Sequence, residues 1–231
     1  MGIFSDLCSA ISEAIKPIAS AISSVLQNSP LMQKLMPVLA VAIPPPFDVV
    51  AVVALEVIAA ALGKPENPDE LGWQMNQADK TPEDFDSFDE YKEFLDREYP
   101  FDRAAFDAQT DEEKSACRYA GMAGTIEELK EAKGFELNAN ALGVLAGAAS
   151  ALGWGRDTIK SFTSGMLNTI GGAGLVSFNA LADYAKGGVD QSVGGIIDKA
   201  ISAGIKLSGI SDAVDVVKTA MQTVATSVEN A

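Results

Sequence analysis

Residues 193–228 read VGGIIDKAISAGIKLSGISDAVDVVKTAMQTVATSV and hold the most regular hydrophobic pattern in the chain. One apolar stripe recurs there at alternating spacings of three and four. A second stripe accompanies its first half and consists of Ile197, Ile201 and Ile205. Two adjacent stripes suit a long helix that touches neighbours on both sides, as in multi-helix barrels. Periodicity leaves open whether those neighbours belong to the same chain or to another copy. The residues of the first stripe that we expect to make contacts between copies are Leu207, Ile210, Val214, Val217, Met221 and Val224.

The opening residues carry a similar stripe. Between residues 4 and 25 seven apolar side chains follow a spacing of 4-3-4-3-4-3, which places them on one face of a helix that Pro17 would kink. The opposite face is rich in serine and poor in charge. Three interpretations stay open: a surface helix on its own core, a helix that joins copies of the protein, or a helix on a membrane. The residues expected to join copies are Ile11, Ile15, Ile18 and Ile22.

Two apolar segments follow, over residues 35–43 and 49–62, with three prolines at 44–46 between them. The second segment would form a helix of roughly 21 Å, which is shorter than the about 30 Å of a bilayer's hydrocarbon core. We therefore expect a helical hairpin, placed in a protein core or in a bilayer, in which Glu56 needs a partner. Its apolar residues include Val49, Val50, Val52, Val53, Leu55 and Ile58.

The middle of the chain, residues 64–134, is acidic, with 20 Asp and Glu against 9 Lys and Arg. Capping-box patterns at 87–90, at 110–113 and from Thr125 to Glu128 predict helices over residues 88–98, 111–120 and 126–133, the last ended by Gly134. Most of the chain's aromatic residues lie here and predict a compact helical module. Because so many carboxylates form pairs by chance, and because the glycine of a calcium loop is absent, we expect no catalytic or metal site among them.

The third segment, residues 135–231, is rich in Ala and Gly. Asn138 can cap a helix that runs to Leu152 and ends at Gly153, and further helices are expected over 158–170 and 175–186. In the first of these helices Gly143 and Gly147 belong to a ridge of small residues repeated every four positions. Such a ridge lets another helix approach closely. The sequence thus divides into residues 1–63, 64–134 and 135–231, and predicts an all-α fold that forms a helical oligomer or tube.

Composition excludes several classes of function. The chain of 231 residues lacks histidine and has a formal net charge of −15. Without histidine it can form neither a Ser–His–Asp triad nor a His-ligated zinc site. Its acidity argues against sequence-specific binding of nucleic acid. Cys8 and Cys117 show no metal-binding or redox spacing, and the N-terminus does not resemble a cleavable signal peptide. We expect no cofactor, no metal and no enzymatic activity.

In style the opening MGIFSDLCSAISEAIKPIASAISSVL and the stretch LNANALGVLAGAASALGWG resemble short internal virion proteins of tailed phages. Both stretches are Ala/Ser/Gly-rich helices without a signal peptide. Proteins of that kind are ejected and assemble into channels across the host envelope. The resemblance therefore implies a DNA-ejection or channel component that is located in the virion and then in the host envelope. Its partners would be itself, membrane lipid and other virion proteins.

Two alternatives remain beside this interpretation. One is a virion structural protein, in the tail or at a vertex, that forms oligomers without touching lipid. The other is a secreted pore-forming or translocator protein, a class whose sequences have a similar composition. An enzyme that uses acidic residues is a third possibility, but no motif supports it.

Overall fold

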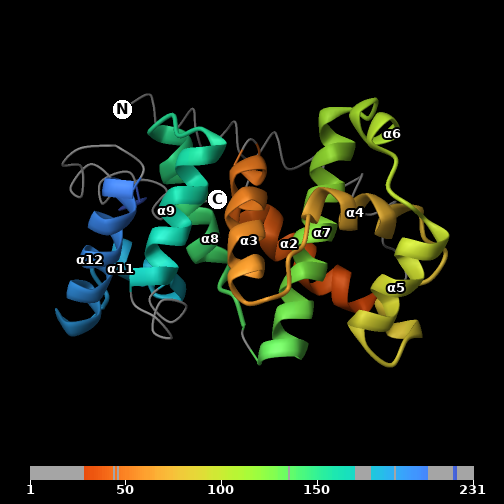
Figure 1. The fold of residues 1–231 in the computed structure, drawn as a ribbon, viewed down its shortest axis with the longest axis horizontal. Helices are drawn as coiled ribbons and strands as arrows, with labels where there is room; N and C mark the ends of the chain where they lie inside the picture. Colours follow the sequence, from red (N-terminus) through yellow and green to blue (C-terminus); the bar gives the residue numbers. More distant parts are fainter. Residues whose placement is uncertain are drawn as a thin grey trace.

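The computed structural model describes residues 29–43, 45, 47–134, 136–169, 178–189, 191–207 and 221–222. Every regular element in these ranges is a helix, so the predicted all-α class is confirmed (Figure 1). In chain order the elements are α2 (Pro30–Ala42), α3 (Asp48–Ala61), α4 (Pro68–Gln77), the 3-10 helix η1 (Pro82–Asp84), α5 (Phe88–Glu98), α6 (Arg103–Asp107), α7 (Asp111–Lys133), α8 (Ala139–Ala151), α9 (Arg156–Thr169), α11 (Leu181–Ala185) and α12 (Gln191–Leu207).

Helix α7 organises one half of the molecule. It begins at the capping box of Thr110 and Glu113, and it ends at Gly134, whose φ of 63° is left-handed. It packs against α2, α3, α4 and α5. The hydroxyl of Tyr119, buried on α7, donates a hydrogen bond of 2.7 Å to the carbonyl oxygen of Ile43, just after α2. One hydrophobic cluster contains residues from all three predicted segments.

The prediction of two helices over 111–120 and 126–133 was wrong, because α7 is continuous. Thr125, expected to cap the second helix, lies buried inside α7 and its hydroxyl donates to the carbonyl oxygen of Gly121 at 2.8 Å. Glu128, the expected capping-box partner, is drawn into an ion network with lysines instead. The small residues between the two segments permit close packing and do not break the helix.

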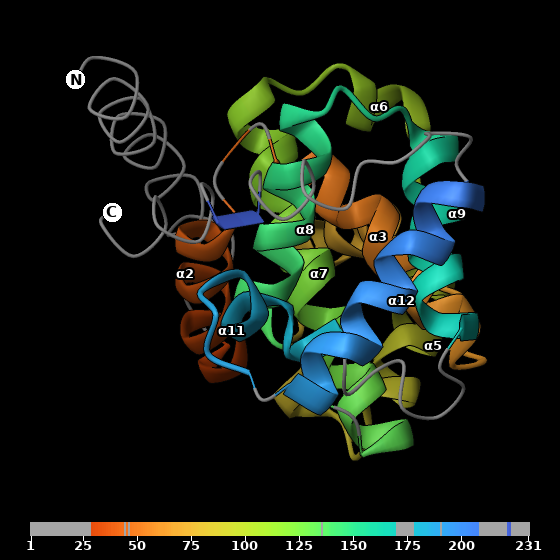
Figure 2. The same ribbon diagram turned by 90° about the vertical axis from the view of Figure 1, so that its left-hand side faces the viewer.

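The expected hairpin segments become α2 and α3, which lie on either side of the proline turn. Each packs against both α7 and α8, and Figure 2 shows the two helices standing apart with α7 and α8 drawn between them. Val52, Val53, Leu55 and Ile58 are buried in the core, Val50 is partly buried, and Val49 is 48% exposed. Among the described residues, no helix combines the length and the apolar character needed to cross a membrane.

Helix α8 follows its sequence signals. The side chain of Asn138 accepts a hydrogen bond from the backbone of Asn140, and Gly153 has a φ of 67° beyond the helix end. Gly143 lies against the end of α2, where an added Cβ would be 2.0 Å from the carbonyl oxygen of Ala42. Gly147 is buried. The small residue at position 143 thus allows the backbones of α8 and α2 to meet.

The last helices pack on α8 and α9. α9 starts at Arg156, slightly before the predicted helix over 158–170, and α11 ends before Gly187, as expected from the glycine pair. α12 packs against α9 and α11, and Ile197 and Ile201 on its second stripe are fully buried. Residues 208–220 and 223–228 of the predicted long helix lie outside the described residues. Met221 is helical and buried in the common core.

Candidate functional site

A cleft of about 660 Å³ lies between α3 and α9. Figure 1 shows these two helices side by side, and they pack directly on each other. The loop that follows α3 closes one end of the cleft. The residues around it are Glu56, Val57, Ala60, Ala61, Pro65, Glu66, Asn67, Arg156, Lys160, Ser164 and Leu167.

The spacing of residues on α9 explains its polar wall. Arg156, Lys160 and Ser164 recur every four residues, so they share one face of the helix. Ile159 and Phe162 lie on the buried side and anchor α9 in the core. The amphipathic sequence of α9 therefore turns Arg156, Lys160 and Ser164 toward the cleft.

One ion pair crosses the cleft. Glu56, the acidic residue in the apolar run of α3, accepts a charged hydrogen bond from the guanidinium of Arg156, 100 residues away in sequence. The side chain of Glu56 is 16% exposed, whereas that of Arg156 is 55% exposed. The partner that Glu56 was expected to need is thus in the same chain. Lys160 is exposed and, among the described residues, forms no ion pair.

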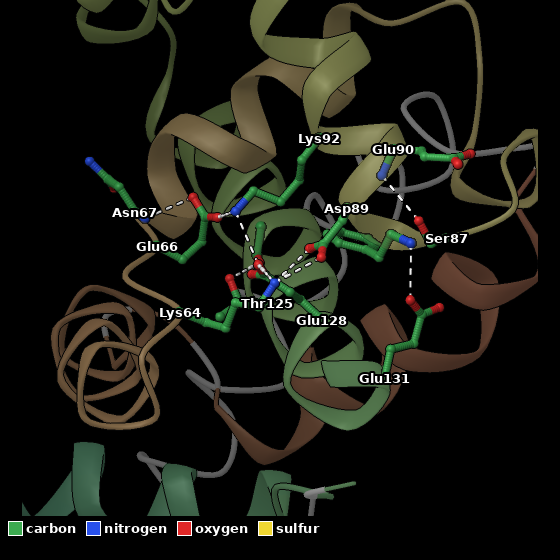
Figure 3. A network of polar contacts seen from close by, with 12 residues as sticks. Lys64, Glu66, Asn67, Ser87, Asp89, Glu90, Lys92, Thr125, Glu128 and Glu131 are labelled. Carbon is green, nitrogen blue, oxygen red and sulfur yellow. Dashed lines mark hydrogen bonds and ion pairs between the residues drawn. The ribbon is translucent and has the colours of Figure 1, made fainter. Parts of the chain in front are cut away.

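Beyond the cleft, a network of ion pairs joins the loop after α3 to α5 and α7 (Figure 3). Lys92 on α5 pairs with Glu66 in the loop and, at 3.1 Å, with Oε1 of Glu128 on α7. Lys64 pairs with Asp89 at 2.7 Å and lies 3.7 Å from the same Oε1 of Glu128. Glu66 also accepts the backbone N–H of Asn67. This network fixes the end of the cleft that Glu66 lines.

Glu128 is the most deeply buried carboxylate of the network. Its side chain is 2% exposed, and its Oε2 atom finds no hydrogen-bond partner among the described residues. Burial raises the pKa of Glu128, and the charges of Lys92 and Lys64 offset only part of that effect. Burial alone would lower the pKa of Lys92, but its hydrogen bonds and charge interactions with Glu66 and Glu128 raise it. The network therefore holds a carboxylate whose pKa lies above its ordinary value.

A second buried network lies at the start of α3. Asp48 is 1% exposed and accepts hydrogen bonds from Ser115 at 2.8 Å and from Arg118 at 3.2 Å. Arg118 also lies 3.3 Å from Asp69 on α4. Burial raises the pKa of Asp69, and the charge of Arg118 opposes the shift. A single guanidinium thus links α3, α4 and α7, which is a structural role.

The other side chains that could react are shielded from solvent. Burial raises the pKa of the Cys117 thiol to about 11, so little reactive thiolate exists near neutrality. Within the ranges that the structure describes, no three Asp, Glu or Cys side chains gather as a metal site would require. The arrangement at the cleft can bind by charge and by apolar contact.

The structure brings the predicted contact residues together only in part. Val52, Val53, Leu55, Ile58 and Met221 share the core of this chain. Leu207 ends α12, and its side chain lies outside the described residues, as do Ile11, Ile15, Ile18, Ile22, Ile210, Val214, Val217 and Val224.

Sequence reasoning singled out Glu56 but not the basic side chains of the cleft or the buried Glu128. A signal for Glu128 existed, since it continues the 4-3-4 series of buried residues Cys117, Gly121 and Gly124 on α7. Glu56 was noticed for the same reason, as a charge inside an apolar run. Neither pattern names the residue that neutralises the charge.

Comparison with known proteins adds no relationship. No protein-family model matches the chain, and neither the curated proteins nor the solved structures contain a significant match.

Proposed function

We propose that this chain is a non-enzymatic helical protein that assembles with copies of itself through its terminal apolar stripes. The observation that carries the proposal is that neighbouring isoleucines on α12 differ in their burial. Ile197 and Ile201 are fully buried against the chain's own helices, whereas Ile196 is only partly buried. Successive residues point about 100° apart around a helix, so Ile196 belongs to a different face.

The face of α12 that contains Ile196 carries the longer of the two apolar stripes in the sequence. The chain's own core takes up Ile197 and Ile201, and also Met221 farther along the longer stripe, which leaves the partly buried Ile196 to contact something else on α12. In sequence this stripe continues through Leu207 to Val224. The partly exposed Ile196 would be covered if the same helix of another copy packed against it. A ring or tube of copies follows from repeating that contact.

For the role of the assembly, we propose a component of a phage virion that takes part in DNA ejection and reaches the host envelope. The Ala/Ser/Gly-rich composition of the two stretches quoted above supports this role. The net charge of −15 supports this role too. A strongly acidic protein would repel DNA phosphates, so DNA could pass along it without binding. Contact with lipid would fall to the stripe at residues 4–25, because four of the six apolar residues assigned to the hairpin are buried.

Assembly is tested by size-exclusion chromatography with light scattering. Wild-type protein should elute as an oligomer, and Ile196→Glu should shift it toward the monomer because the charge enters the contact face. Gln191→Glu is the matched control, since Gln191 is exposed on the same helix and gains the same charge. A wild-type protein that is strictly monomeric in water and in detergent would overturn the proposal.

Liposome flotation tests the envelope role separately. Recovery of protein with the vesicles supports the ejection or channel component. Recovery only in the aqueous fraction overturns lipid contact and, if the protein is oligomeric, supports a virion structural protein of the tail or vertex.

A further inference from the structure

We propose that the cleft between α3 and α9 binds a small organic anion with an apolar body, in which Lys160 and Arg156 contact the anionic group. This binding site is independent of assembly through α12.

Among the residues that the structure describes, one cation at the cleft, Lys160, has no partner. Two acids and two bases line it, and both acids are engaged: Glu56 by Arg156, and Glu66 by Lys92 and the backbone of Asn67. In the described part of the chain Lys160 has no carboxylate within ion-pair distance. Lys160 is therefore an unpaired ammonium group in a protein of net charge −15, and an anion is the complement of that group.

Arg156 can serve as the second contact for an anion. Its side chain is 55% exposed, so its guanidinium is accessible beyond the pair with Glu56. Arg156 and Lys160 are four residues apart on α9 and therefore neighbours on the helix surface. A carboxylate at this place could accept hydrogen bonds from both side chains, because a guanidinium carries five N–H donors and an ammonium three.

The opposite wall is apolar and accessible. Val57, Ala60 and Ala61 of α3 face the cleft together with Pro65 and Leu167, and the two alanines and the proline are exposed. The volume of about 660 Å³ lies within the range of about 300–1,000 Å³ that is typical of small-molecule sites. A basic edge beside an apolar wall fits a molecule with an anionic head and a hydrocarbon body, and fits an inorganic ion less well.

The test uses the full chain and octanoate as the probe, with binding followed by calorimetry or by shifts of amide signals from α3 and α9. Octanoate should bind saturably, and more weakly as the salt concentration rises. Octylammonium, which has the same tail and the opposite charge, should not bind there. Acetate, which has the head without the tail, should bind at least about tenfold more weakly, since each buried CH₂ contributes roughly 0.8 kcal/mol.

Two variants locate the site. Lys160→Gln should weaken octanoate binding by about threefold or more, the size expected for an exposed charge contact. Lys34→Gln, at an exposed lysine on α2, removes the same charge away from the cleft and should leave binding unchanged. Ala60→Glu places a carboxylate on the apolar wall and should also weaken binding. Both Lys160 and Ala60 are exposed, so the variants should fold, which circular dichroism checks.

The proposal is overturned if octanoate does not bind, if octylammonium binds as well, or if Lys160→Gln and Lys34→Gln bind octanoate equally. Equal binding of acetate and octanoate would overturn the apolar part of the site. None of these outcomes depends on the oligomeric state, so failure here is distinct from failure of the proposed assembly.

Discussion

Gly72 and Gly121 face each other where α4 crosses α7. A Cβ added to Gly72 would lie 1.7 Å from the carbonyl oxygen of Cys117, and one added to Gly121 would lie 1.7 Å from that of Pro68. Each position also comes within 2.9 Å of the other glycine's backbone nitrogen. The two helices thus meet backbone to backbone, and neither glycine leaves room for a side chain. This contact joins the acidic part of the chain to its central helix.

Gly121→Ala should destabilise the protein by about 3 kcal/mol, because the added methyl group overlaps backbone atoms that cannot turn aside as a side chain would. Urea unfolding measures the loss. Gly155→Ala is the control, since nothing lies within 4 Å of its added Cβ. Equal stability of Gly121→Ala and wild type would show that α4 and α7 do not approach so closely.

Arg118→Met should cost about 3 kcal/mol at neutral pH, because it leaves the buried Asp48 and the partly buried Asp69 without their cation. Lowering the pH should reduce the deficit, since burial raises the pKa of Asp69 and its protonated carboxyl needs no positive partner. Arg97→Met, at a side chain that is 68% exposed, should change the free energy of unfolding by less than about 0.5 kcal/mol. Urea titrations at several pH values measure both variants. A deficit that does not depend on pH would count against an electrostatic cause.

Glu128→Gln tests the raised pKa of the buried carboxyl. Since burial raises the pKa of Glu128 in the folded state, the folded protein binds this proton more tightly than the unfolded chain. The stability contributed by the group is fully present below the unfolded value of about 4.3 and is lost as pH rises through the folded pKa. The wild type should therefore lose stability relative to Glu128→Gln as pH rises from about 4.3 toward neutrality.

Thermal or urea unfolding across that pH range measures the difference, and Glu112→Gln in the exposed first turn of α7 reports the general effect of removing one negative charge. A wild type that gains stability over Glu128→Gln as pH rises would contradict the direction of the shift.

The Cys117 thiol should react slowly with a disulfide reagent at pH 8. With a pKa of about 11 it carries on the order of a hundred times less thiolate than an ordinary cysteine of pKa about 8.5. Cys8→Ser protein isolates the signal of Cys117, and the same protein unfolded in urea gives the reference rate. Comparable rates in the folded and unfolded protein would show that the thiol is accessible.

Local signals in the sequence predicted much of the fold. Helix α5 occupies 88–98 as predicted, and α8 begins after Asn138 and ends near Gly153, because capping side chains and left-handed glycines act within a few residues of the helix end. The same logic failed at Thr125. A threonine followed by acids resembles a helix start, but its hydroxyl can equally bond to the carbonyl four residues back in a continuous helix.

Local sequence patterns could not predict the cleft or the ion pairs around it. The partners of Glu56 and Glu128 lie 100 and 36 residues away, and nothing in the spacing of charges along an acidic chain identifies which lysine or arginine will reach a buried carboxylate. Apolar periodicity predicted that α12 has two faces. Which face turns inward depends on α9 and α11, and therefore on tertiary packing.

The hydrogen bond from Tyr119 to Ile43 has a consequence for how the protein is made. Helices α2 and α3 leave the ribosome well before α7, the helix against which both pack. At about 5–20 residues per second, the 72 residues that follow Ala61, up to Lys133, take roughly 4–14 s to synthesise. For those seconds the valines of α3 have no native cover on the side of α7. The nascent chain is then a natural client for a chaperone, and slow codons ahead of α7 would lengthen its exposure.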